Sequence, residues 1–153
     1  MRNWTIINDY EQIIKILFEF RNDLYNKTFT DNELEELARK YEKYAKVIVQ
    51  TDEDGHNFGF VVMYCNDKKR KIAFISMIAV KHSCRKQGIG KALLENATEI
   101  AKENDMNVIQ LNVDKKNVSA QNFYTNQNFY VVSQSTKSLV MEKNLYLKTY
   151  ICN

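Results

Sequence analysis

A short segment in the middle of the chain combines residue types that bind phosphate. Residues 85–94 read Arg-Lys-Gln-Gly-Ile-Gly-Lys-Ala-Leu-Leu and lie between an expected strand and an expected helix. The free N–H groups and partial positive charge of a helix N-terminus bind anionic oxygens. Gly88 and Gly90 place no side chain in the way, and in a chain with only four glycines this pair indicates a local requirement. Three side chains add positive charge: Arg85, Lys86 and Lys91.

Three glycine patterns compete for this segment. A Walker P-loop fails, because Arg85 stands where its first glycine belongs and Ala92 where its hydroxyl belongs. The dinucleotide fingerprint G-x-G-x-x-G is closer, since Asp114 ends the next expected strand as a ribose-binding acid would, but Leu93 replaces the third glycine. The pattern R-x-x-G-x-G fits without exception. A dinucleotide-binding fragment remains as an alternative, and it predicts binding of NAD.

A second segment, residues 117–124, reads Asn-Val-Ser-Ala-Gln-Asn-Phe-Tyr and is followed by Asn128-Phe129. Its expected helix covers residues 118–125. Asn117 and Tyr124 are seven residues apart, so both lie on one helix face within about two turns. The helix can therefore bring both side chains to the same end of a bound ligand.

The two segments together resemble the GNAT superfamily of N-acetyltransferases. Residues 80–94 are similar to its central signature, and residues 117–124 are similar to its N-x-x-A-x-x-x-Y helix. The order of expected elements matches the family from about residue 4 to residue 142. Two positions depart from the pattern: His82 stands where the family often has proline, and Asn128 where it often has glycine. Asparagine tolerates positive φ better than most residues, so the second change is mild.

The resemblance implies an acetyl-CoA-dependent enzyme without a metal. The backbone of residues 87–92 would hold the pyrophosphate of coenzyme A, and the backbone of Ile78 and Val80 would pair with the pantetheine arm. Asn117 would contact that arm, and Tyr124 would face the thioester sulfur. The implied cofactor-binding residues are Ile78, Val80, Arg85, Lys86, Gln87, Gly88, Ile89, Gly90, Lys91, Ala92 and Asn117.

Direct attack of an amine on a thioester needs a neutral nucleophile, an oxyanion donor and an acid for the leaving thiolate. Tyr124 can supply the acid, and backbone donors near Ile78 can stabilise the oxyanion. The general base is not evident, because residues 72–78 contain neither a carboxylate nor a histidine, where the family often places a glutamate. The alternative function is therefore a catalytically silent acyl-CoA-binding or regulatory domain with the same fold.

The elements expected around these segments form a mixed α/β sheet. Its N-terminal half is antiparallel and leads into a βαβ unit that binds the acyl-CoA. Gly59 lies inside an expected strand and indicates a bulge or a close approach. The expected strands are residues 4–7, 45–50, 58–65, 72–80, 108–113, 129–132 and 138–142. Expected helices begin after Asp9, at Thr30 or Asp31, and near Gly90, and residues 145–153 form an unassigned tail.

Composition limits the remaining possibilities. The 153 residues suit one GNAT-like domain spanning 1–153, and the net charge of +3 gives little support for nucleic-acid binding. No apolar run is long enough for a membrane span, and the N-terminus lacks features of a signal peptide. Three cysteines without C-x-x-C spacing favour a cytoplasmic protein. The expected partner is an amine, either a small molecule or a protein amino group, and the protein is expected to be a monomer or homodimer.

Overall fold

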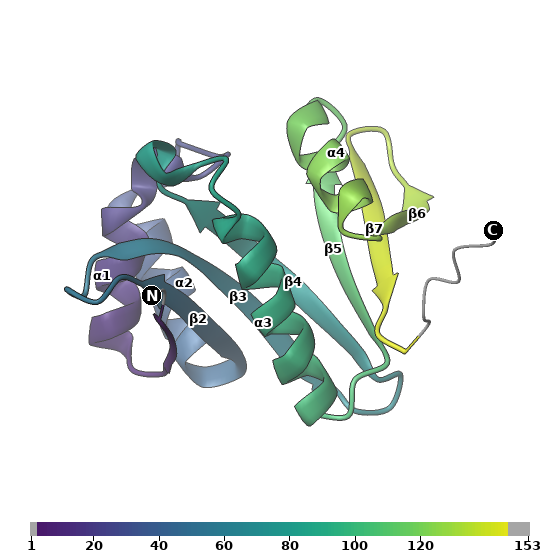
Figure 1. The fold of residues 1–153 in the computed structure, drawn as a ribbon, viewed down its shortest axis with the longest axis horizontal. Coiled ribbons are helices and arrows are strands. Elements are labelled where there is room, and N and C mark those ends of the chain that lie inside the picture. Colours follow the sequence, from purple (N-terminus) through teal and green to yellow (C-terminus); the bar gives the residue numbers. More distant parts are fainter. Residues whose placement is uncertain (1–2, 147–153) are drawn as a thin grey trace.

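The computed structural model describes residues 3–146, and a seven-stranded mixed sheet forms its centre (Figure 1). The strand order is β1-β2-β3-β4-β5-β7-β6. The strands are β1 (Asn3–Ile7), β2 (Ala45–Thr51), β3 (Asn57–Asp67), β4 (Ile72–Val80), β5 (Val108–Asp114), β6 (Tyr130–Gln134) and β7 (Ser138–Asn144). The helices are α1 (Tyr10–Glu19), α2 (Asp31–Tyr44), α3 (Ile89–Glu103) and α4 (Val118–Asn126), with short 3-10 turns at Arg21–Asp23 and His82–Cys84. The expected mixed α/β architecture is confirmed.

Helices cover both faces of the sheet. Figure 1 shows α3 and α4 in front of the sheet and α2 behind it. One apolar core joins α3 and α4 to the sheet, through residues such as Leu93 and Tyr124. The other joins α1 and α2 to the opposite face, through residues such as Leu17 and Leu34. The cores fix α3 and α4 on the same side, which brings the two sequence segments described above together.

The first two helices begin at residues whose side chains cap them. The carboxylate of Asp9 accepts a hydrogen bond from the Gln12 N–H at 2.8 Å, as expected for the start of α1. At α2, the Thr30 hydroxyl accepts from the Glu33 N–H at 3.1 Å, and the Glu33 carboxylate accepts from the Thr30 N–H at 3.4 Å. This reciprocal capping box satisfies two free donors at the helix start. These bonds fix the residue at which each of the two helices begins.

The sheet separates between β4 and β5. These strands run parallel but pair only from Ile72 with Val108 to Ile75 with Leu111. At the next residue, Ser76, the pairing of β4 with β3 shifts register, and β4 then continues alongside β3 to Val80. A register shift of this kind bends a strand and changes its twist. The far half of β4 consequently turns away from β5, and Figure 1 shows the two ribbons diverging.

Gly59 on β3 allows a close approach, as the sequence predicted. A Cβ atom at this position would lie 2.7 Å from the Ala79 carbonyl oxygen and 3.0 Å from a methyl of Leu93 on α3. The pairing of β2 with β3 also shifts register between Gln50 and Thr51, next to Gly59. Any larger residue would push β4 and α3 apart, and with them the start of α3.

The ends of several elements differ slightly from expectation. β3 extends through Asp67, two residues beyond its expected end, so the turn to β4 lies at residues 68–71, and Lys71 has a φ of 57°. Phe129 precedes β6 and is buried, because its ring packs against Tyr124. Leu145, from the unassigned tail, is buried and donates its N–H to the Asn107 carbonyl, while residues 147–153 lie outside the described residues. No helix within residues 3–146 has the length and apolarity needed to cross a membrane.

Candidate active site

The separation of β4 from β5 opens into a groove with two adjoining chambers. The large chamber, about 870 Å³, extends from the end of β4 to the start of α3 and to α4. The small chamber, about 290 Å³, lies between β4 and β5. Both are bounded by the connection that follows α1. The residues that line both chambers are Leu24, Tyr25, Ile78, Asn117, Ala120 and Tyr124.

The start of α3 presents backbone donors to the large chamber. Gly88 is the N-cap, with a φ of 78°, and Lys86 before it also has a positive φ of 63°. The first helical hydrogen bond runs from the Ala92 N–H to the Gly88 carbonyl at 3.1 Å. The four preceding N–H groups, from Gly88 to Lys91, therefore have no partner within the helix. Such a helix start is well suited to bind a phosphate group.

Gly90 is small for a reason other than backbone conformation. It has helical geometry, and a Cβ atom placed on it would lie 3.1 Å from the Phe123 ring of α4. The absence of a side chain thus lets α4 approach the start of α3. Positive φ, which glycine tolerates at either position, occurs at Gly88 and not at Gly90.

Arg85 holds two parts of the groove together. Its guanidinium donates to the Asp23 carbonyl at 3.1 Å and to the Val80 carbonyl at 3.3 Å. The Asp23 carboxylate in turn accepts from the His82 N–H at 2.9 Å, and Lys81 pairs with Glu19 at 2.6 Å. The connection after α1, which walls both chambers, is thereby attached to the segment between β4 and α3. The remaining positive charge of the large chamber comes from other side chains: Lys27, Lys86 and Lys91.

We expect Arg85→Lys to loosen the connection after α1 almost as much as Arg85→Ala does. A lysine keeps the charge but lacks the planar fork that reaches two carbonyls at once. Hydrogen bonds to charged groups contribute about 1.5–3 kcal/mol, so amide-exchange protection at Asp23 to Tyr25 should fall by about tenfold or more in both variants. Hydrogen exchange followed by mass spectrometry measures this. Full protection in Arg85→Lys would show that charge alone is needed.

The far half of β4 offers an unpaired edge to the groove. Ile78 and Val80 line the large chamber, and within the described residues they pair with β3 but not with β5. Backbone groups on such an edge can bind an extended ligand as though it were another strand. The edge therefore suits the pantetheine-binding role that the resemblance implies.

Tyr124 lies where the two chambers meet. Its side chain is 7% exposed, and its ring packs against Phe123 and Phe129 with centroid distances of 5.3 and 5.6 Å. Burial raises the pKa of Tyr124 to about 12, so the hydroxyl keeps its proton at neutral pH. Asn117, at the start of the same helix, accepts the Ala120 N–H at 3.1 Å and also lines both chambers. A protonated tyrosine thus lies where the two chambers share their lining residues.

The groove brings together most of the residues predicted from sequence. Gln87 and Ala92 are the exceptions, since neither lines a chamber. The Gln87 amide approaches the Ser83 carbonyl at 3.5 Å, and the Ala92 N–H is used inside α3. Sequence reasoning missed the contribution of the connection after α1, namely Asp23, Leu24, Tyr25, Asn26, Lys27 and Phe29. These residues carry no motif, and only the fold places them at the groove.

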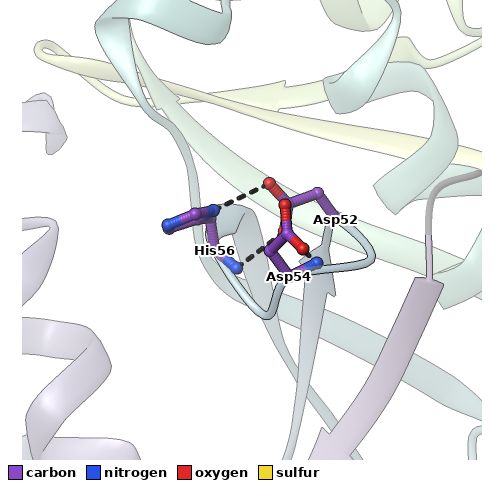
Figure 2. Close-up of side chains that lie close together, drawn as sticks. All are labelled: Asp52, Asp54 and His56. Atoms are coloured by element: carbon purple, nitrogen blue, oxygen red, sulfur yellow. Dashed lines mark hydrogen bonds and ion pairs between the residues drawn. The ribbon is translucent and has the colours of Figure 1, made fainter.

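Another group of potential ligands lies on the turn between β2 and β3 (Figure 2). Ligand atoms of Asp52, Asp54 and His56 lie within 4.8 Å of one another. Hydrogen bonds inside the turn account for this arrangement: the Asp52 carboxylate accepts the Asp54 N–H at 2.9 Å and the His56 N–H at 2.8 Å, and contacts His56 Nδ1 at 2.9 Å. These bonds lower the pKa of Asp52, the backbone bond from His56 most. The group is sufficiently explained as a turn, and we assign no metal to it.

Known proteins are similar to this chain in sequence or in fold. Residues 11–129 match the acetyltransferase (GNAT) family. An uncharacterized N-acetyltransferase of Methanocaldococcus jannaschii is 35% identical over 98 residues, which cover 56% of this chain but only 43% of that protein.

Two solved structures share the fold at lower identity. The Escherichia coli ribosomal-protein-S18-alanine N-acetyltransferase is similar with a TM-score of 0.78 and 15% identity, over 100% of this chain and 99% of that one. PaiA N-acetyltransferase from Thermoplasma acidophilum, solved with coenzyme A, has a TM-score of 0.69 and 18% identity, over 93% and 99%. The family match covers most of the chain, and the chain therefore belongs to the GNAT family of acetyltransferases.

Proposed function

We propose that the protein transfers an acetyl group from acetyl-CoA to a primary amine by direct attack of the amine on the thioester. The observation that carries this proposal is the groove of two adjoining chambers, with the N–H donors of the α3 start on the large chamber and Tyr124 lining both chambers. The complex of the Thermoplasma relative with coenzyme A supports the choice of donor. Membership of the GNAT family supports the choice of reaction.

In this proposal the large chamber holds the cofactor. The pyrophosphate binds the N–H groups from Gly88 to Lys91, with Lys86 and Lys91 nearby. The pantetheine arm follows the open edge of β4 past Val80 and Ile78, so the thioester arrives beside Tyr124. The amine enters from the small chamber, which meets the large one at that point.

The proposed reaction passes through a tetrahedral intermediate. The amine nitrogen bonds to the thioester carbon, and backbone N–H groups of β4 near Ile78 stabilise the oxyanion. The carbon–sulfur bond then breaks, and the Tyr124 hydroxyl gives its proton to the departing thiolate. The nitrogen gives its extra proton to water or to a residue outside Ile72–Ile78, because that part of β4 holds no carboxylate or histidine, and the Tyr124 phenolate then regains a proton from solvent. The products are an N-acetyl amine and free coenzyme A.

The cofactor and the reaction can be tested separately. We expect calorimetric titration to show binding of acetyl-CoA and none of NAD or ATP. A panel of primary amines, assayed by release of the free thiol, should then identify acceptors. Binding of NAD without acetyl-CoA would contradict the cofactor assignment. Binding of acetyl-CoA without turnover of any amine would instead favour the catalytically silent acyl-CoA-binding domain. The observation that favours this alternative is that β4 has no carboxylate to act as a general base.

Direct attack also predicts that no acetyl-cysteine forms. Cys65 is buried, and burial raises the pKa of its thiol, which leaves little reactive thiolate at this residue. Cys84 is half-buried at the large chamber, and Cys152 lies outside the described residues. Mass spectrometry after incubation with acetyl-CoA alone should show no adduct at any of the three. A stoichiometric adduct that an amine discharges would contradict direct attack.

A further inference from the structure

The two chambers differ in the charge of their walls. Four cationic side chains line the large chamber, together with Asp23, whose carboxylate already accepts a backbone N–H. The cations are Lys27, Arg85, Lys86 and Lys91. The small chamber has no cationic side chain among its lining residues, all of which lie within residues 3–146, and a single charged one, Asp114. A cation in the groove is thus favoured on the small-chamber side.

The chain around Asp114 holds this carboxylate in place. Asp114 ends β5, and its Oδ1 accepts the Lys116 N–H at 2.8 Å. Its backbone carbonyl accepts from the Asn117 N–H at 2.9 Å and from the Gln121 side chain at 3.0 Å. The residue is half-buried, and it has no ion-pair partner within residues 3–146. A fixed, partly desolvated carboxylate without a cation is a favourable site for one.

The remaining walls of the small chamber are neutral. Apolar side chains and neutral polar side chains make up these walls, and Asn112 precedes Asp114 on the same face of β5. The aliphatic and phenylalanine members are Leu24, Phe29, Ile75, Met77, Ile78, Leu111, Val113 and Ala120. Such walls suit an aliphatic or otherwise apolar body between two polar ends of an acceptor.

Asp114 is poorly suited to hold the amine that reacts. An alkylammonium resembles that of lysine, with a pKa of about 10.4, and an adjacent carboxylate raises this value further. If Asp114 paired with the reacting nitrogen, it would keep that nitrogen protonated, and the lone pair that must attack the thioester would not be available. Pairing with a second, non-reacting cation has no such cost, and it orients the acceptor across the chamber.

We propose that the acceptor carries two positive groups, one of which reacts while the other binds Asp114. The acceptor class is thus an amine with a second cationic centre, separated from the first by an apolar spacer that the apolar walls accommodate. This inference rests on the proposed function, because it takes the small chamber as the entrance for the amine.

The test compares two acceptors of equal length. One is a four-carbon diamine, and the other is the four-carbon amino alcohol in which a hydroxyl replaces the second ammonium. A hydrogen-bonded charge contributes about 1.5–3 kcal/mol, so the wild-type protein should favour the diamine in kcat/KM by about 10- to 100-fold. In Asp114→Asn this preference should fall to the statistical factor for two equivalent amino groups. The asparagine oxygen still accepts the Lys116 N–H, so the chain there keeps its conformation.

Asp105→Asn is the matched control. Asp105 lies just before the start of β5, at the end opposite to Asp114, and its substitution removes the same negative charge. Its φ of 61° is one that asparagine tolerates. We expect this variant to keep the wild-type preference. An unchanged preference in Asp114→Asn, or an equal loss of rate with the amino alcohol, would overturn the inference. Should the protein acetylate no amine, the proposed function fails, and calorimetric binding of the two acceptors to the protein with coenzyme A still tests Asp114: equal affinities would overturn it.

Discussion

Gly90→Asp is expected to weaken the binding of acetyl-CoA by roughly 100-fold or more while the protein remains folded. The new carboxylate would sit in the first turn of α3, among the N–H groups that face the large chamber. Like charges in contact cost several kcal/mol, and about 1.4 kcal/mol corresponds to a tenfold change in affinity. Calorimetric titration measures the affinity, and circular dichroism with thermal unfolding checks the fold.

Gly90→Asn and Gly90→Ala separate charge from bulk. Any Cβ atom at this position lies 3.1 Å from the Phe123 ring, so both controls should lower the melting temperature slightly as the ring moves aside. Asparagine has nearly the shape of aspartate but no charge, so it should bind acetyl-CoA much more tightly than Gly90→Asp. Equal losses in the two variants would mean that bulk, and not repulsion, blocks the site. Wild-type affinity in a folded Gly90→Asp protein would place the pyrophosphate elsewhere.

Tyr124→Phe is expected to lower kcat by about 100-fold or somewhat less, with little change in the affinity for acetyl-CoA. General-acid catalysis contributes about 10²–10⁴-fold in rate, and a thiolate is already a fair leaving group, which favours the low end. The cofactor contacts from the backbone are unchanged, so the loss belongs to an interaction made in the transition state. Steady-state kinetics, combined with a direct binding measurement, distinguishes the two quantities.

The role of Tyr124 can also be checked through the pH dependence of the rate and through a second tyrosine variant. Since the pKa of Tyr124 is about 12, its hydroxyl stays protonated and the wild-type rate should not fall on its account until the pH approaches that value. Tyr130→Phe removes a hydroxyl from an exposed tyrosine on β6 that bonds to Glu142, away from the groove, and should keep the wild-type kcat. If Tyr124→Phe keeps its kcat and loses only thermal stability, the residue serves packing alone.

The sequence predicted the elements of the fold well because local signals mark them. Asp9 and Thr30 start helices through hydrogen bonds to residues three positions later, which a sequence pattern can reveal. Asn128 adopts a φ of 70°, which explains how asparagine can occupy a position where the family often has glycine. Gly88 likewise shows the positive φ expected of a glycine before a helix. Each of these features depends on neighbours along the chain.

The site was less predictable because its walls come from distant segments. Asp23 and His82 are bonded across 59 positions, and Arg85 reaches back to Asp23 across 62. The register shift at Ser76 depends on how β3 and β4 pair, which the residues of β4 alone do not specify. Side-chain type indicated which residues could bind a cofactor, but only the packed fold separates Arg85, which bonds to two carbonyls, from the cations left for a ligand.

The short pairing between β4 and β5 has a consequence for how the molecule responds to its cofactor. Within residues 3–146, four registered pairs between β4 and β5 lie at one end of the boundary between β1–β4 and β5–β7, with backbone bonds to the Lys71 carbonyl beside them, and the core beneath α3 adds side-chain contacts. An acyl-CoA molecule lying along β4 would also contact both sides of the groove where β4 and β5 do not pair, and would hold the two parts of the sheet together there. Binding of the cofactor would then raise the resistance of the protein to separation of β4 from β5, in addition to supplying the acetyl group. The protein without cofactor would be the more flexible form, and it would open first between β4 and β5.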